Sequence, residues 1–203
     1  MTKLILRTIA VTLASVLVAL AVAFGAATLF APKMIAGIFD GVGNYSATVF
    51  FYEKQYQKTG SLDDLAVVIN KLDKVSDKEK TYDYIKVMVS SDGFDDYCTA
   101  SDTLENGLIT TKEYFYSLYT ESATLNEGFN KGVEIACAYV DANGYTEFNP
   151  IRMLISDFAD IATYDQLDGL KNQIESRLSS FSATQTALAN YDINDINQLL
   201  SDK

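Results

Sequence analysis

The side chains that could carry chemistry in this sequence are carboxylates, tyrosines and two cysteines, because the chain contains no histidine. Without histidine, the Ser-His-Asp and Cys-His arrangements of nucleophilic catalysis are excluded, and so is the commonest zinc ligand. Glycine-rich phosphate-binding loops do not occur either. We therefore expect no catalytic residue, no metal site and no cofactor. A hydrolase of the cell envelope that uses paired carboxylates stays open as the least favoured alternative.

The two cysteines, Cys98 and Cys137, each stand four positions after an apolar residue, Phe94 and Val133. This spacing places both on apolar helix faces, where a buried thiol is the default and burial raises its pKa. A disulfide between them is also allowed if this part of the chain is exported. Buried thiols are the favoured interpretation.

The segment DANGYTE at Asp141–Glu147 has some features of a calcium-binding loop. An EF-hand loop that begins at Asp141 requires Glu at its twelfth position, and Arg152 stands there instead. Asn143-Gly144 is typical of a helix end that needs a left-handed residue. The sequence therefore favours a helix end over a metal site.

A long apolar segment lies near the N-terminus. No charged residue lies between Arg7 and Lys33, and Ile9–Phe30 is almost wholly apolar. As a helix, this run can cross a hydrocarbon core about 30 Å thick. Lys3 and Arg7 precede it and only Lys33 follows closely, so the positive-inside bias puts the N-terminus in the cytoplasm and residues 33–203 outside.

A cleaved secretory signal is the alternative, because Ala21-Val22-Ala23 and Gly25-Ala26-Ala27 resemble cleavage sites. Signal-peptide apolar regions run roughly 7–15 residues, and this one is longer, so a retained anchor is favoured. Both interpretations export the rest of the chain.

Small residues recur every four positions on one face of the expected span. Such spacing lets two helices approach closely in lipid, although alanine is also common in such segments for no special reason. Self-association through this face is therefore the less favoured of two interpretations. The residues are Ser15, Ala19, Ala23 and Ala27.

All 27 acidic residues, but only 14 of the 16 lysines and arginines, lie in residues 33–203, which gives this part a net charge of −13. Such a surface repels nucleic acids and anionic lipid headgroups and favours cationic partners. Solubility alone also explains the charge. We expect no nucleic-acid partner.

A short phrase, a bulky apolar residue followed by Asp or Asn, returns along the chain. It is LDDL at 62–65, FDDY at 94–97, FNKG at 129–132 and YDQL at 164–167, with starts 32, 35 and 35 residues apart. Apolar residues between the phrases follow the i, i+3, i+4, i+7 spacing of amphipathic helices, and no strand-like alternation is sustained. The sequence therefore predicts an all-α fold.

Helix starts are indicated by capping-box pairs and by Asn149-Pro150. An aromatic phrase repeats every 32 residues, at 50–52, 82–84 and 114–116, which predicts helix pairs. We expect a helix at 45–59, hairpins over 61–91, 92–125, 126–162 and 163–190, and a closing helix at 193–201. The capping pairs are Ser61 and Asp64, Ser76 and Glu79, Thr110 and Glu113, Thr163 and Gln166, and Ser182 and Gln185.

Over about residues 45–190 the chain resembles a tetratricopeptide-like (TPR-like) repeat protein, on the period near 34 residues and the helix–turn–helix unit. The resemblance implies an α-solenoid, a stack of hairpins that bury apolar faces against one another. It also implies that the stack binds a protein or peptide in a concave groove.

The sequence thus predicts three parts. Residues 1–32 form a cytoplasmic tip and a transmembrane signal-anchor, 33–44 a flexible linker at the membrane face, and 45–203 an extracytoplasmic helical-repeat domain. Tyr52 and Tyr56 share a helix face and are candidates for partner binding, although packing in the core is favoured for each. We expect a scaffold or accessory subunit of a cell-envelope complex, or else a binding protein for a small or peptidic cationic ligand.

Overall fold

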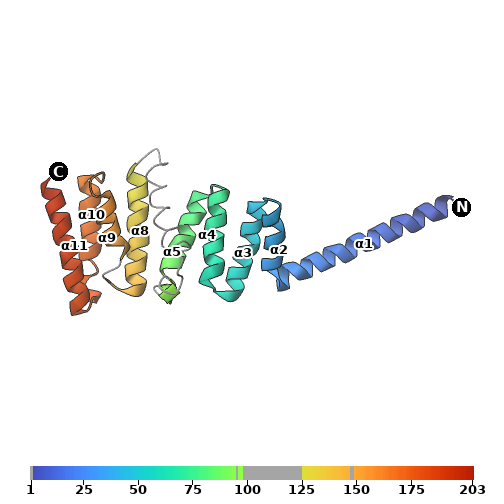
Figure 1. The fold of residues 1–203 in the computed structure, drawn as a ribbon, viewed down its shortest axis with the longest axis horizontal. Coiled ribbons are helices and arrows are strands. Elements are labelled where there is room, and N and C mark those ends of the chain that lie inside the picture. Colours follow the sequence, from blue (N-terminus) through green and yellow to red (C-terminus); the bar gives the residue numbers. More distant parts are fainter. Residues whose placement is uncertain (1, 95, 98–124, 147–148) are drawn as a thin grey trace. The chain divides into compact units, whose positions relative to one another are not determined.

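The computed structural model describes residues 2–94, 96–97, 125–146 and 149–203 (Figure 1). Every regular element in these ranges is a helix, so the predicted all-α fold is confirmed. The chain divides into two compact units, Met1–Ser76 and Asp77–Lys203. This division falls inside the hairpin expected over 61–91.

The first unit begins with the predicted apolar helix, α1 (Thr2–Phe30). Within it, the 24 residues of Arg7–Phe30 are long and apolar enough to cross a membrane, and the most apolar window is not buried at all. Three further helices follow: α2 (Pro32–Gly41), α3 (Tyr45–Thr59) and α4 (Leu62–Lys74). The helix expected at 45–59 is therefore observed as α3.

The flexible linker expected over 33–44 is wrong for most of its length, because Pro32–Gly41 form α2. Pro32 stands at the start of the helix, where its missing N–H costs nothing. Ile35 and Ala36 are buried against Phe51 of α3. This packing outweighs the cost of the two glycines in the helix, about 1 kcal/mol each relative to alanine.

The local sequence explains where α3 begins and ends and which face of α4 is buried. Asn44 accepts a hydrogen bond from the Ala47 N–H at the start of α3, and Gly60, with φ 64°, ends it in a left-handed conformation that suits glycine. The apolar stripe predicted for α4 is buried. Its members include Leu65, Ala66, Ile69 and Leu72.

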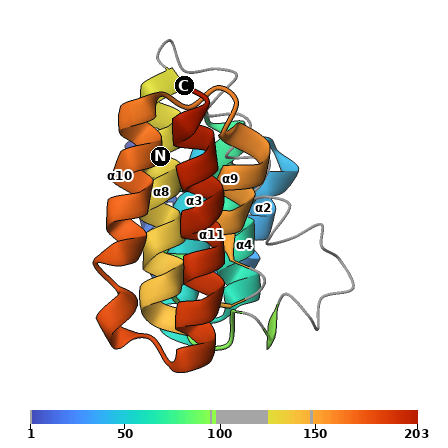
Figure 2. The ribbon, with the colours of Figure 1, turned by 90° about the vertical axis from the view of Figure 1, so that its left-hand side faces the viewer.

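The second unit contains α5 (Lys78–Val89), α8 (Leu125–Asn143), α9 (Pro150–Phe158), α10 (Tyr164–Glu175), a 3-10 turn η1 (Leu178–Ser180) and α11 (Ala183–Ser201). α8 packs against α5, α9 and α10, and α11 packs against α9 and α10. Figure 2 shows α8, α9, α10 and α11 running alongside one another. The predicted hairpin over 126–162 is thus observed as α8 and α9.

The capping predictions are confirmed at three helix starts. Thr163 with Gln166 and Ser182 with Gln185 form complete capping boxes, and Asn149 accepts a hydrogen bond from the Arg152 N–H. At α4, Ser61 stands at the N-cap without a side-chain hydrogen bond to the backbone.

Three helix boundaries differ from the predictions. Asp77, not Ser76, caps α5. The phrase at 129–132 lies inside α8 instead of opening it. α11 is continuous over Ala183–Ser201, where a break after 190 was expected, because the buried Ala189, Ile193 and Ile196 keep one helical stripe across that point.

The 32-residue aromatic repeat equates Phe50 with Tyr82, but the two have different surroundings. Phe50 is 50% exposed on α3, whereas Tyr82 is 6% exposed on α5. The hairpin expected over 92–125 lies largely outside the described residues, as do Thr110 and Glu113. The TPR-like repeat therefore stays a prediction.

Candidate functional site

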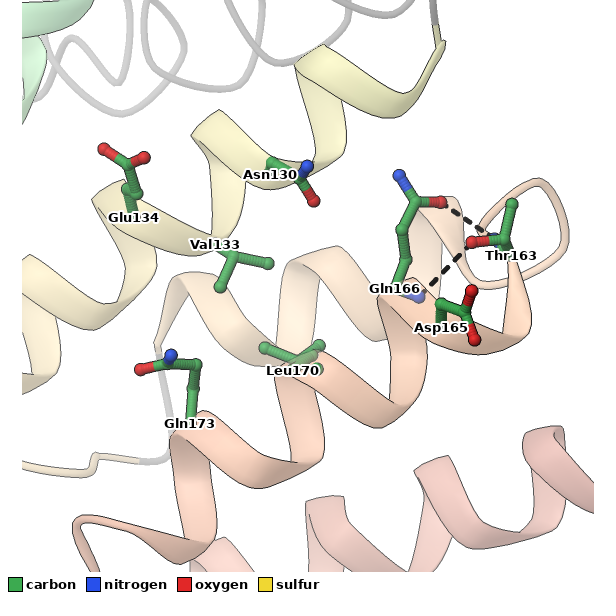
Figure 3. A pocket seen from close by; sticks show the side chains of 9 residues that line it. Asn130, Val133, Glu134, Thr163, Asp165, Gln166, Leu170 and Gln173 are labelled. Atoms are coloured by element: carbon green, nitrogen blue, oxygen red, sulfur yellow. Dashed lines mark hydrogen bonds between the residues drawn. The ribbon is translucent and has the colours of Figure 1, made fainter.

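The second unit has an open groove of about 470 Å³ between α8 and α10 (Figure 3). Its side chains are mostly carboxylates and amides over a small apolar floor. Val133 of α8 and Leu170 of α10 lie between the two helices and form that floor. The polar lining comprises Asn130, Glu134, Thr163, Asp165, Gln166 and Gln173.

The first turn of α10 forms one end of the groove. Thr163 Oγ1 accepts a hydrogen bond from the Gln166 N–H at 3.3 Å, and Gln166 Oε1 accepts one from the Thr163 N–H at 2.8 Å. This capping box fixes the first turn, on which Asp165 is exposed. A carboxylate there is stabilised by the positive end of the helix dipole.

Glu134 supplies the second carboxylate, from α8. Its Oε2 accepts a 2.7 Å hydrogen bond from the Tyr82 hydroxyl and lies 3.7 Å from Lys86 Nζ, both on α5. Burial, and then the hydrogen bond to Glu134, raise the pKa of Tyr82 well above its usual value. Glu134 is thus partly neutralised, while Asp165 has no ion-pair partner within the described part of the chain.

The groove offers charged and hydrogen-bonding groups to a ligand. In the described ranges, no group of three or more Cys, Asp or Glu side chains could hold a metal ion. Amides and carboxylates can instead pair with a ligand that carries a positive charge and N–H donors, such as a lysine or arginine side chain. Gln173 is already engaged, since its Oε1 accepts a 2.8 Å hydrogen bond from Arg177 Nη1.

Two other carboxylates are buried and structural. Asp192 of α11 is 1% exposed; its Oδ2 accepts a 2.6 Å hydrogen bond from the Tyr145 hydroxyl, and its Oδ1 accepts bonds from Arg152 Nε at 3.1 Å and Nη2 at 3.0 Å. Asp64 of α4 is 4% exposed and lies 3.3 Å from Lys33 Nζ. Such pairs tie helices together because a lone buried charge is costly.

The tyrosines proposed for partner binding are only half-exposed. Tyr52 packs against the cluster of Ile35, Ala36 and Phe51, and Tyr56 is also partly buried on α3. Their role in partner binding therefore stays a prediction, and packing accounts for Tyr52.

The small-residue face of α1 has two different parts. Ser15, Ala19 and Ala23 are exposed, and the Ser15 hydroxyl donates to the Val11 carbonyl at 2.9 Å. Ala27 instead packs against the Ile35, Ala36 and Phe51 cluster. Only the first three residues are thus available for self-association.

Cys137 is a buried free thiol on α8, as the favoured interpretation expected. Burial raises the pKa of this thiol, against a smaller opposing effect of Arg177. Cys98, the other cysteine of the disulfide that the sequence allows, lies outside the described residues.

The Asp141–Glu147 segment ends α8, as expected, and Gly144 takes the left-handed conformation at φ 79°. Asp141 binds the guanidinium of Arg177 through both oxygens, at 2.7 and 3.0 Å. This contact occupies the first residue of the segment. Glu147 lies outside the described residues.

Sequence reasoning missed the buried carboxylates and the groove. For Asp192 a signal was present: it shares the helical spacing of Ala189, Ile193 and Ile196, and an aspartate on an apolar face requires a partner. For the groove there was none, since it depends on how α8 and α10 pack.

No protein-family model, curated protein or solved structure matches this chain. In its described part, the structure therefore establishes an all-α fold whose N-terminal helix is long and apolar enough to span a membrane.

Proposed function

We propose that this protein is a single-pass membrane protein whose helical part, outside the membrane, binds another protein as a scaffold or accessory subunit of a cell-envelope complex. The observation that carries this proposal is α1. The most apolar window of its 24-residue span is not buried against any described part of the chain, which leaves that surface open to a bilayer.

The orientation follows from charge. Lys3 and Arg7 precede the span and only Lys33 follows it closely, which favours a cytoplasmic N-terminus and extracytoplasmic units. A stack of TPR-like hairpins is the arrangement that we propose for the helices beyond the span. Such stacks present extended surfaces to protein partners.

The groove between α8 and α10 is the proposed contact for the partner, through a segment that carries a lysine or arginine. Asp165 and Glu134 supply the negative charge, and Val133 and Leu170 supply apolar contact for the stem of a long basic side chain. Its volume, about 470 Å³, is also within the range of small-molecule pockets. A small cationic ligand is therefore the second candidate.

Affinity capture of the full-length chain from detergent tests the first candidate. We expect a partner in stoichiometric amount that is lost or strongly reduced with Asp165→Asn. Glu175→Gln is the matched control, since Glu175 is an exposed carboxylate on the same helix outside the groove lining. Equal capture by both variants would remove the groove from the proposal.

Thermal denaturation separates the two candidates. Stabilisation of the purified chain by amines or short basic peptides, reversed by Asp165→Asn and not by Glu175→Gln, favours the ligand-binding alternative. Capture of a protein without any such stabilisation favours the scaffold.

A further inference from the structure

One face of α2 is apolar and exposed. Met34 and Ile38 of α2, and Val42 at its C-cap, are spaced four residues apart and are 60%, 58% and 74% exposed. The opposite face of the helix is buried, with Ile35 and Ala36 packed against α3. α2 therefore has two apolar faces. One is packed inside the first unit, and the other is exposed.

This face begins where the span ends. α1 ends at Phe30 and α2 starts at Pro32. The ring of Phe51, on α3, lies 6.3 Å from that of Phe24 in α1 and 5.6 Å from that of Phe39 in α2. α2 and α3 thus pack beside the last turns of the span, as Figure 1 also shows.

The length of the span bears on how close α2 and α3 lie to the bilayer surface. Twenty-four helical residues extend about 36 Å, which is about 6 Å more than the hydrocarbon core. Ala27, in the last turns of α1, is in contact with the α2–α3 cluster. The α2–α3 hairpin, attached at the end of this span, is therefore within reach of the bilayer surface.

The charge of this segment also suits a lipid surface. Residues 31–60 carry three lysines and two acidic residues, a net charge of +1, whereas residues 61–203 carry −14. Asp40, the one acidic residue of α2, is paired with Lys71 at 2.6 Å. Lys58 Nζ donates to the Phe30 carbonyl at 3.2 Å, next to the end of α1.

We propose that Met34, Ile38 and Val42 form a docking surface that inserts into the outer leaflet of the membrane. This inference rests on the proposed span. Lipid is the partner that fits, because the surface is continuous with the helix that enters the bilayer and is not acidic. Interfacial helices bury an apolar face about 5–10 Å into the boundary between headgroups and acyl chains.

The chain contains no tryptophan, so a single introduced tryptophan reports on one site. Full-length Met34→Trp and Ile38→Trp are reconstituted in vesicles of phosphatidylcholine and phosphatidylglycerol with brominated lipids. We expect blue-shifted emission at these sites, with at least twofold stronger quenching by bromines near the headgroup than by bromines deep in the chains.

Two further variants make the outcomes separable. Asp73→Trp, exposed on α4 of the same unit, should stay unquenched. Val18→Trp, in the middle of the span, should be quenched best by the deep bromines. If Val18→Trp is quenched while the Ile38→Trp signal matches Asp73→Trp, the docking surface is wrong and the span stands.

Two other results also overturn the inference. A blue-shifted Ile38→Trp without lipid quenching would mean that protein, a second copy or another chain, covers the face. An unquenched Val18→Trp would remove the span, and with it both the proposed function and the docking surface.

Discussion

Asp63 and Asp64 are neighbours in α4 with the same side chain and different surroundings. Asp63 is exposed, whereas Asp64 is buried, accepts a 2.9 Å hydrogen bond from the Thr59 hydroxyl and pairs with Lys33. Asp64→Asn should destabilise the first unit by about 1–2 kcal/mol, because the buried charge-assisted contacts are weakened. Asp63→Asn should stay within about 0.5 kcal/mol.

Amide hydrogen exchange of α4 in the full-length chain measures both effects. Faster exchange with Asp64→Asn alone supports the structural role of this carboxylate. Equal exchange in the two variants would contradict it.

Asp192 makes the corresponding contact in the second unit. Asp192→Ala removes the carboxylate that accepts hydrogen bonds from the Arg152 guanidinium and from the buried Tyr145 hydroxyl. We expect a loss of about 3 kcal/mol, at the lower end for a broken buried pair, since Arg152 is partly exposed and can be hydrated. Urea denaturation followed by circular dichroism checks this, with Asp195→Ala on the same helix as the control.

The buried phenols of Tyr82 and Tyr145 should make the folded protein less stable at alkaline pH. Burial, and then a hydrogen bond to a carboxylate, raise the pKa of each phenol well above its usual value. The unfolded chain loses these protons from about pH 10, while the folded chain keeps them. The free energy of unfolding should therefore be unaffected by these groups below pH 10 and fall above it, by about 1.4 kcal/mol per pH unit for each group.

Tyrosinate absorbance during a pH titration follows this directly. Two phenols should ionise only together with unfolding, and Tyr145→Phe should remove one of them. Ionisation of all tyrosines before any loss of helix would show that neither hydroxyl is protected.

At the scale of the element, the capping box of α10 is the feature most directly readable from sequence. Thr163→Ala removes the acceptor for the Gln166 N–H and should cost about 1 kcal/mol. Amide exchange in the first turn of α10 should then become about fivefold faster. Thr184→Ala, at an exposed site in the first turn of α11, is the control and should change exchange little.

Helix type and most helix starts were predictable because they depend on local chemistry. Asn149, Thr163 and Ser182 cap helices where the spacing indicated. α2 was missed because glycines lower the helix propensity of residues 33–44, while the burial of Ile35 and Ala36 depends on α3. Tertiary packing outweighed local propensity there.

At the scale of the whole molecule, sequence predicted one helical domain after the span, and the structure has two compact units that divide after Ser76. The groove residues come from segments more than 30 positions apart, such as Glu134 and Asp165. Only the packing of α8 against α10 brings them together. Their charges were visible in the sequence, but their shared surface was not.

Retention of α1 as a membrane anchor, with both units outside the cell, can be measured directly. The full chain, with one tag at each end, is produced in spheroplasts, whose membranes are washed with alkaline carbonate and whose outer face is exposed to protease. We expect the chain to stay in the membrane pellet, the C-terminal tag to be digested and the N-terminal tag to be protected. Release by carbonate, loss of the N-terminal tag before protease treatment, or protection of the C-terminal tag would contradict the account.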